Sequence, residues 1–377
     1  MRTRIINILK TVTAAFSMSV IALTSVCFAP SVRAEAMQKS NFSFNIGAYS
    51  ARFSREKPII AVVAENSFTE LTDYVIPFGV ISASGAANVL ALATQQGSVQ
   101  MFPALKVQPQ ATTAQFDARF PDGADFVIVP AVHRVDDATL IAWIRSQADK
   151  GATIVGVCDG VWVVANAGLL DGKSAVGHWY SIDDLKAKFP AVHFLRDRRY
   201  LADGNVVTTT GVTASIPVSL ALVEAIAGRE RAVAVAQYLG IKDWGASHRG
   251  EDFTLTLSNV VTAATNWLAF WLHEDIEIPV THGMDEIALA LAADAFSRTY
   301  RSTAYAQSTT SEPITTSHGL TVIPDRVVAP NTGSRTVNLP VGVPAALMLD
   351  EALRQIGNTY GVATADFVSL QMEHPKP

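Results

Sequence analysis

One stretch constrains the fold more than any other part of the chain: residues 151–179, GATIVGVCDGVWVVANAGLLDGKSAVGHW. TIVGV is short, apolar and β-branched, as in a fully buried strand, and VWVVANAGLL is predicted to form a helix. Cys158 and Asp159 therefore fall at the turn between a strand and a helix. In a parallel sheet covered by helices, ligands bind at the carboxyl ends of the strands, where Cys158 would lie.

The glycines around this cysteine predict a nucleophile turn. Gly156 and Gly160 flank Cys158 in a G-x-C-x-G pattern, which leaves room for a sharp turn and for an anion against the backbone amides of Asp159 and Gly160. The positive end of the following helix would favour thiolate over thiol. The sequence thus predicts a presented, ionised sulfur.

Residues 1–34 have the pattern of a secretory signal. Arg2, Arg4 and Lys10 precede the apolar stretch TVTAAFSMSVIALTSVCF, and small residues precede a cleavage site after Ala34. We expect a periplasmic or secreted mature chain that starts with an irregular leader, residues 35–57. The alternative is that the segment is retained as a membrane anchor.

Charge and cysteine content restrict the partners. Without residues 1–34, which hold four basic and no acidic residues, the net charge falls from −5 to −9. An acidic chain without a basic run argues against nucleic acid as a partner. Cys158 becomes the only cysteine, so it is either buried and inert or kept for its reactivity.

Strands and helices alternate along the first part of the chain. The pattern predicts a helix over 69–84, interrupted near Pro77, then a hairpin-like excursion and a helix over 136–151. After the nucleophile turn it predicts a second hairpin and a helix over 212–227 that ends at Gly228. The predicted buried strands are 59–64, 89–94 and 124–131. This order is typical of an α/β fold with a mainly parallel sheet sandwiched by helices.

The length of 377 residues favours two domains, which we place at 58–245 and 246–377. The second is predicted to be a truncated lobe that resembles the first, with a helix at 281–296, a strand at 302–308 and no counterpart of the nucleophile turn. We therefore expect no chemistry there. Residues 254–272, TLTLSNVVTAATNWLAFWL, are too polar at their start to span a bilayer and are predicted to form a buried connecting helix.

The stretch WIRSQADKGATIVGVCDGVWVVANAGLLDGKSAVGHW, with DGNVVTTTGVTASIPVSLALVEAIAG after it, resembles the ThiJ/PfpI superfamily of class I glutamine amidotransferase-like proteins. Within it, the chain is most similar to the amidotransferase-like lobe of AraC-type regulators, over about residues 58–240. The regulators' helix-turn-helix is not visible in the sequence. The resemblance implies a flavodoxin-like sandwich with a cysteine at the nucleophile turn.

The resemblance also implies site residues. Glu70 matches a glutamate that lies against the sulfur, so that one group of the pair stays protonated. His178 matches a family histidine that could act as general base or acid. The peptidase-like branch has histidine directly after the cysteine, and Asp159 at that position counts against peptidase activity. Ala131-Val132 replaces a Gly-Gly pair found in many relatives.

Each of these residues also has a structural interpretation. Cys158 could be a small buried hydrophobe, Glu70 an exposed acid in a first helical turn, His178 a packing residue and Asp159 a helix N-terminal acid.

His282 and Glu286 are spaced like zinc ligands on a helix, but no third ligand lies near them in the sequence. We therefore predict no metal and no cofactor.

The leading functional prediction is a cysteine-dependent hydrolase, hydratase or lyase that acts on a small carbonyl-like or nitrile-like substrate. Cys158 would be the nucleophile, Glu70 its protonated partner and His178 the proton shuttle, with the amides of Asp159 and Gly160 as anion donors. The alternatives are a non-catalytic module that binds or senses a small molecule, and a thiol redox sensor. We expect a monomer or homodimer without membrane contact after cleavage.

Overall fold

The computed structural model describes residues 46–327 and 335–375. The predicted signal segment, its cleavage site and the start of the leader lie outside these residues. Residues 46–57 contain no helix or strand, as predicted for the leader.

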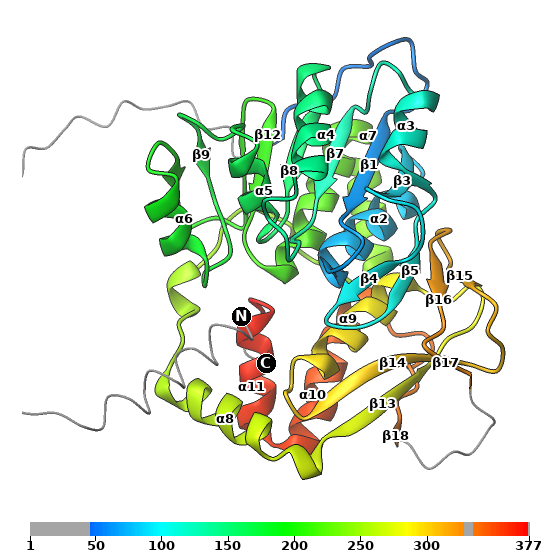
Figure 1. The fold of residues 1–377 in the computed structure, drawn as a ribbon, viewed down its shortest axis with the longest axis vertical. Helices are drawn as coiled ribbons and strands as arrows, with labels where there is room; N and C mark the ends of the chain where they lie inside the picture. Colours follow the sequence, from blue (N-terminus) through cyan, green and yellow to red (C-terminus); the bar gives the residue numbers. More distant parts are fainter. Residues whose placement is uncertain (1–45, 328–334, 376–377) are drawn as a thin grey trace, which may run out of the picture. The chain divides into compact units, whose positions relative to one another are not determined.

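A seven-stranded sheet forms the centre of the first region (Figure 1). All neighbouring strands are parallel except β11 and β12, which form the predicted hairpin. This confirms the predicted α/β class. The strands, in spatial order, are β11 (Tyr200–Asp203), β12 (Val206–Thr209), β8 (Thr153–Gly156), β7 (Phe126–Val129), β1 (Ile59–Ala64), β3 (Asn88–Ala93) and β6 (Ala111–Thr112).

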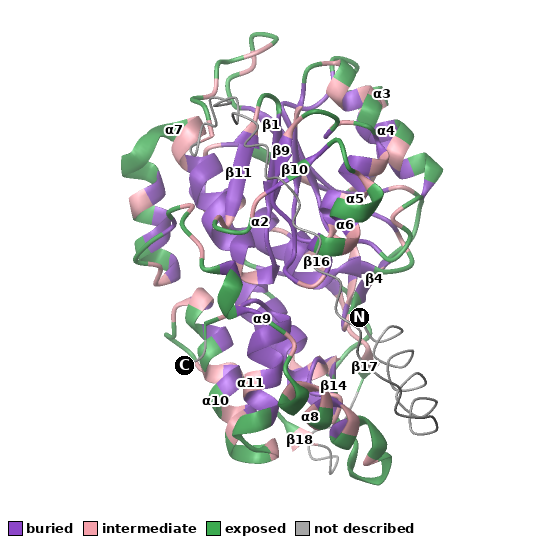
Figure 2. Cartoon of the chain, turned by 90° about the vertical axis from the view of Figure 1, so that its left-hand side faces the viewer, coloured by how far each residue is buried: buried purple, intermediate pink, exposed green. Residues whose placement is uncertain are grey.

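Side chains of β1 alternate between two apolar cores, one on each face of the sheet. Ile60 and Val62 join the core under α2 (Leu71–Ser84) and α7 (Ser215–Leu239). The neighbouring residues of β1 join the core under α3 (Thr113–Arg119), α4 (Ala138–Asp149) and α5 (Gly160–Asn166). Burial on both faces explains why the strand sequence is continuously apolar (Figure 2).

Two helices differ from the sequence prediction in detail. Helix α2 begins at Leu71 because Thr69–Glu70 form the short strand β2, and it continues through Pro77 without interruption. In α7, Gly228 has φ 81° and breaks the helical backbone, which confirms the predicted stop. Among the described residues, Val212–Leu239 is long and apolar enough to cross a membrane, but most of it is buried in the core of this protein.

A second, four-stranded parallel sheet lies in the remaining region, in the order β17-β14-β13-β18. The predicted strand 302–308 and helix 281–296 are present as β14 and α9. The elements are β13 (Glu274–Pro279), β14 (Ser302–Ser308), β17 (Arg326–Val327), β18 (Arg335–Thr336), α8 (Leu257–Leu268), α9 (Glu286–Ser297), α10 (Met348–Tyr360) and α11 (Val362–Gln371).

The two regions are joined by a third sheet and by a common core. The hairpin of β15 (Ile314–Thr315) and β16 (Thr321–Ile323) pairs with the hairpin of β4 (Val99–Phe102) and β5 (Lys106–Gln108). Helix α9 packs on α2 so closely that a Cβ on Gly79 would lie 2.8 Å from the Ile287 side chain. The order β13-α9-β14-β15-β16 follows that of β1-α2-β3-β4-β5, but a truncated copy of the first lobe remains a prediction.

Helix α8 is the clearest departure from the sequence prediction. It was expected to be buried, yet Ala263 and Asn266 are its only buried residues. Leu257 and Leu268 are 79% and 56% exposed. The prediction of a buried helix is wrong because α8 contacts α11 along one side and leaves its other apolar side chains in the open.

The loop after α5 completes the first region with three short elements, α6 (Ile182–Lys188), β9 (Ser174–Ala175) and β10 (His193–Phe194).

Candidate functional site

Cys158 occupies a tight turn between β8 and α5, as predicted. Its φ of 54° lies in the left-handed region, which is strained for a residue with a side chain. A Cβ on Gly160 would lie 2.0 Å from the carbonyl oxygen of Val129, and a Cβ on Gly156 would lie 3.0 Å from Val164. The two glycines are therefore needed for α5 to pack this closely on β7 and β8.

Backbone amides at the turn have unequal roles. The Asp159 amide donates to the sulfur of Cys158. The Gly160 amide instead donates to the carbonyl of Val157 at 2.8 Å and closes the turn. The prediction of Gly160 as an anion donor is therefore wrong, whereas the Asp159 amide faces the reactive atom. The amide of Cys158 itself is held by Thr209 Oγ1 at 3.0 Å.

The structure does not support the predicted thiolate at Cys158. Cys158 is 6% exposed, and burial raises its pKa well above the ordinary value, with further increases from Asp73, Asp159 and Glu70. The Asp159 amide acts in the other direction but does not compensate. Loss of hydration and nearby negative charge both disfavour a thiolate, so Cys158 is a neutral thiol at neutral pH.

Glu70 is buried, and its carboxyl group is near enough to Cys158 to raise the pKa of the thiol. Burial raises the pKa of Glu70 well above its ordinary value, although the charge of Arg298 opposes the shift. A carboxyl in this environment stays protonated at a higher pH than one in water. The structure thus agrees with the expected environment of Glu70, and its catalytic role remains a prediction.

Asp73 was missed by the sequence interpretation. It lies one helical turn after Glu70 and is completely buried. Its Oδ2 accepts a hydrogen bond from the Ala131 amide at 3.1 Å, and its Oδ1 has no partner among the described residues. Burial raises its pKa well above the ordinary value. The three-residue spacing from Glu70 was the signal, because residues three apart share a helix face.

Arg298, at the end of α9, brings a positive charge to the cluster from the second region. Its Nη2 donates to Glu70, and its Nε donates to Asp294 Oδ1 at 2.5 Å. Thr72 Oγ1 donates to the other oxygen of Asp294 at 3.1 Å. The second region thus contributes a side chain that contacts the predicted catalytic carboxyl group, which the sequence interpretation did not foresee.

His178 is buried in the loop after α5. Its Nδ1 accepts a hydrogen bond from the Tyr180 amide at 3.3 Å. Its ring also lies against Gly211. These contacts hold the ring in place. Whether His178 also transfers protons stays a prediction.

Asp159 lies at the N-cap position of α5, which agrees with its interpretation as a helix N-terminal acid, but its side chain makes no capping hydrogen bond. Its Oδ2 accepts from Ser181 Oγ at 2.9 Å, and the Ser181 amide donates to the His178 carbonyl at 3.0 Å. Asp159 therefore ties the His178 loop to the cysteine turn.

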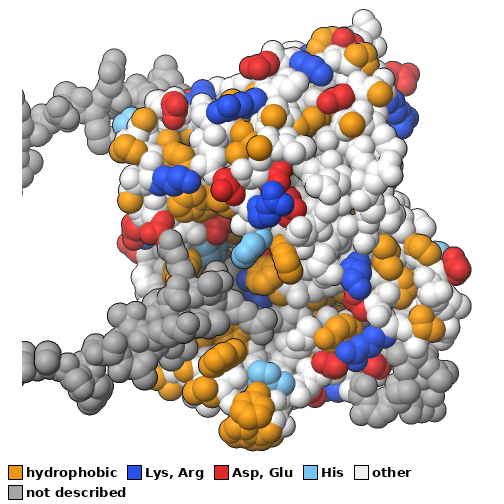
Figure 3. Space-filling model, in the orientation of Figure 1, with side chains coloured by type: hydrophobic (Ala, Val, Ile, Leu, Met, Phe, Trp, Pro, Cys, Tyr) orange, Lys and Arg blue, Asp and Glu red, His pale blue; other side chains and the backbone are white. Residues whose placement is uncertain are grey.

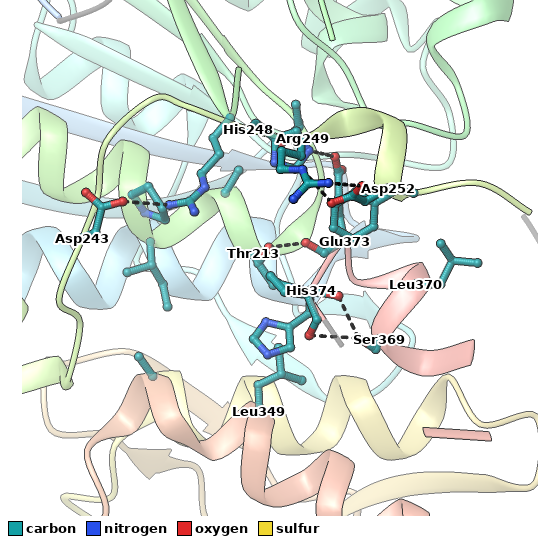
Figure 4. Close-up of a pocket in the computed structure, with 18 of the residues that line it drawn as sticks. Thr213, Asp243, His248, Arg249, Asp252, Leu349, Ser369, Leu370, Glu373 and His374 are labelled. Carbon is teal, nitrogen blue, oxygen red and sulfur yellow. Dashed lines mark hydrogen bonds and ion pairs between the residues drawn. The ribbon is translucent and has the colours of Figure 1, made fainter. Parts of the chain in front are cut away.

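A cavity of about 930 Å³ with a largely apolar wall lies among α2, α7, α9, α10 and α11. Thr210, which follows β12, lines it, while Cys158 does not. Figure 4 shows Glu373 at one side, where Oε1 contacts His248 Nε2 at 2.7 Å. The other oxygen of Glu373 accepts from the Gly211 amide at 2.5 Å. The C-terminal segment thus closes over the loop beside the cysteine turn.

Within residues 46–327 and 335–375, no group of three or more His, Cys, Asp or Glu side chains is arranged to hold a metal ion. His282 and Glu286 have different partners: His282 accepts from the Thr315 amide, and Glu286 contacts His318 Nδ1 at 2.7 Å.

Comparison with known proteins gives matches over the first region. The DJ-1/PfpI family model matches residues 59–225. The HTH-type transcriptional regulator CdhR of Pseudomonas aeruginosa is 36% identical over 98 residues, which are 26% of this chain and 29% of the regulator. The isonitrile hydratase of Pseudomonas putida is 37% identical over 98 residues, or 26% and 42% of the two chains.

The regulator GbdR of Pseudomonas aeruginosa is 28% identical over 178 residues, which are 42% of this chain and 47% of the regulator. The chain thus spans less than half of each of these relatives. Among solved structures, Drosophila melanogaster DJ-1beta is 22% identical with a TM-score of 0.45, covering 50% of this chain and 100% of that one. The family match, the parallel sheet and the cysteine turn together show that residues 59–225 form a DJ-1/PfpI family domain.

Proposed function

We propose that the cysteine turn catalyses the addition of water to a small, uncharged electrophile with a nitrile-like or carbonyl-like carbon. The observation that carries the proposal is a neutral thiol on a left-handed turn beside two buried carboxyl groups of raised pKa. Such a set can both remove and supply a proton. The 37% identity to a protein named isonitrile hydratase supports the same class of reaction.

A neutral thiol must lose its proton as it attacks. Asp73 Oδ1 has no partner among the described residues, and of the three neighbouring carboxyl groups Asp73 acts most strongly on Cys158. Its raised pKa makes its ionised form a strong base, so we assign it as the group that accepts this proton. The sulfur forms a bond to the electrophilic carbon while a π bond of the substrate breaks and its electron pair takes a proton from Glu70. The Asp159 amide stabilises negative charge on the sulfur during the attack.

Water then attacks the same carbon and the carbon–sulfur bond breaks. Asp73 returns its proton to the sulfur, one proton of the water returns to Glu70, and the remaining hydroxyl stays on the carbon. The net reaction therefore adds one water molecule to the substrate. Burial of the site favours a small substrate without charge, because a charged one would lose its hydration. Burial and the raised pKa of Cys158 also argue against a redox sensor, which needs an accessible thiolate.

The test is turnover of a panel of small isonitriles, nitriles and aldehydes, followed by NMR detection of the hydrated product. Cys158→Ala should abolish turnover, and Asp73→Asn should lower kcat by roughly 100-fold or more, the usual contribution of a positioned base. Asp275→Asn, a surface change, is the matched control and should leave kcat unchanged. Equal turnover by Cys158→Ala would overturn the proposal.

A second function is favoured by the cavity of about 930 Å³, whose size suits a small-molecule ligand. Under this proposal the chain binds a ligand there without transforming it. Ligands that raise the Tm of the wild-type chain and of Cys158→Ala equally, and whose effect disappears in Leu349→Trp, would support it. Ligands that stabilise Leu349→Trp as strongly as the wild type would count against it.

We also propose export of the chain and cleavage after Ala34. The cleavage-like residues before that position support this proposal. The intact mass of the protein recovered from the periplasm tests it, because a mass that includes residues 1–34 would instead show a retained anchor.

A further inference from the structure

Helix α8 and the turn after it expose an unusual apolar surface. Six side chains are each more than half exposed: Leu257, Val261, Leu268, Phe270, Trp271 and Leu272. We call these six residues the α8 crest. Figure 3 shows hydrophobic side chains gathered at the lower edge of the view, where Figure 1 draws α8. Contiguous apolar patches of this kind mark interaction surfaces in soluble proteins.

The crest lacks charge. Residues 253–272 contain no Asp, Glu, Lys or Arg, although a solvent-facing helix normally carries charged residues on its outer side. The inner side of α8 is well anchored: Asn266 Nδ2 donates to the Thr299 carbonyl and to Thr364 Oγ1, both at 3.0 Å. These bonds hold the helix in an orientation that directs the crest outward.

We propose that the α8 crest docks on the surface of a phospholipid bilayer. Phe270 and Trp271 lie on the tight turn Phe270–Leu272, are 73% and 69% exposed, and pack edge to face with each other. Aromatic rings suit the boundary between headgroups and acyl chains, and a helix with one apolar face lies in the plane of that boundary. A protruding aromatic pair enters a fluid layer more readily than it fits a flat protein surface.

This proposal replaces the expectation, drawn from the sequence, of no membrane contact after cleavage, and the N-terminal segment is consistent with a nearby membrane. Residues 11–28 form the apolar stretch of the predicted signal or anchor. If it is retained, the chain stays at a bilayer and the crest is an additional contact with lipid. If it is cleaved, the crest is a separate, reversible contact. The inference depends on export and not on the chemistry of Cys158.

Charges beside the crest indicate which lipid it meets. Glu251 and Asp252 precede the charge-free segment, and Glu274 and Asp275 follow it. Arginines pair with three of these carboxylates: Arg249 with Asp252, Arg326 with Asp275 and Arg335 with Glu274. These residues therefore carry no excess of positive charge that would select an anionic surface. We therefore expect docking through apolar burial on a neutral lipid such as phosphatidylcholine.

The experiment uses the full chain with vesicles of phosphatidylcholine that carry bromine on their acyl chains, which quenches tryptophan fluorescence at close range. Residues 1–45 contain no tryptophan, so quenching reports on the folded region whether or not the leader is retained. The variant Phe270→Ser/Trp271→Ser removes the aromatic pair. The matched control Phe53→Ser/Phe68→Ser removes two exposed phenylalanines outside the crest, one in the leader and one in the first region.

We expect quenching for the wild type and the control, and partitioning weaker by roughly tenfold or more for the crest variant, because two large apolar groups no longer leave water. Addition of phosphatidylglycerol should not strengthen binding. An unquenched wild type, equal quenching of the crest variant, or binding that requires phosphatidylglycerol would overturn the proposal. The proposal would also be overturned if gel filtration showed a dimer of the wild type that the crest variant does not form, and if this dimer did not bind vesicles. Circular dichroism of each variant verifies the fold.

Discussion

At the scale of single residues, burial and neighbouring carboxyl groups together determine the protonation of the candidate site. Cys158 is surrounded by Asp73, Asp159 and Glu70, each of which raises its pKa. The helix dipole and one amide, which led the sequence interpretation to a thiolate, are weaker than burial combined with three carboxyl groups. A neutral resting thiol is the consequence.

Alkylation of Cys158 by iodoacetamide tests this consequence. The rate should keep rising with pH up to 9 without a plateau, because only the thiolate reacts and its pKa lies above the ordinary value. Asp73→Asn removes the largest of the three charges, so it should lower the pKa and increase the rate at pH 8. Asp275→Asn should leave the profile unchanged. A plateau near pH 7 in the wild type would show that the thiolate predicted from sequence is correct.

At the scale of elements, the site depends on the packing of α2 against α9. Arg298 follows α9 and pairs with Glu70 at the start of α2, 228 residues away in the sequence. Strands and α2 were predictable because apolar periodicity is a local property. The Arg298 contact was not, because nothing in the sequence around Arg298 specifies which distant carboxyl group it meets.

Arg298→Met should destabilise the fold and disturb the site together. Removing the arginine leaves Asp294 and Glu70 buried without a counter-charge, which costs about 3–5 kcal/mol. The loss in free energy of unfolding relative to the wild type should be smaller at pH 5. At that pH the raised pKa of Glu70 allows its carboxyl group to be protonated and neutral. Urea denaturation at pH 5 and pH 8 measures both values.

The control for this variant is Arg354→Met, which removes an exposed arginine paired with Glu351 on α10. Its urea midpoint should stay close to that of the wild type at both pH values. An Arg298→Met midpoint that matches this control would show that the buried ion pair contributes nothing.

At the scale of the whole molecule, the two predicted domains are not independent. One apolar core contains residues of β1, α2 and α7 together with residues of α9 and α10, and hairpins from both regions form one sheet. The sequence predicted the order of elements in each region. It did not predict their shared core, because the same apolar face of α2 could have packed on a second copy of the chain.

We predict that the first region does not fold stably when it is separated from the second. A chain that ends at residue 245 would expose the face of α2 that packs on Ile287 and would leave Glu70 without Arg298, so we expect it to be insoluble or to unfold without a cooperative transition. Co-expression with residues 246–377 should restore solubility and the slow alkylation of Cys158, because the second fragment supplies both the apolar surface and the charge. Cooperative unfolding of the first fragment alone, with the wild-type alkylation profile, would show instead that the second region is dispensable for both the core and the site.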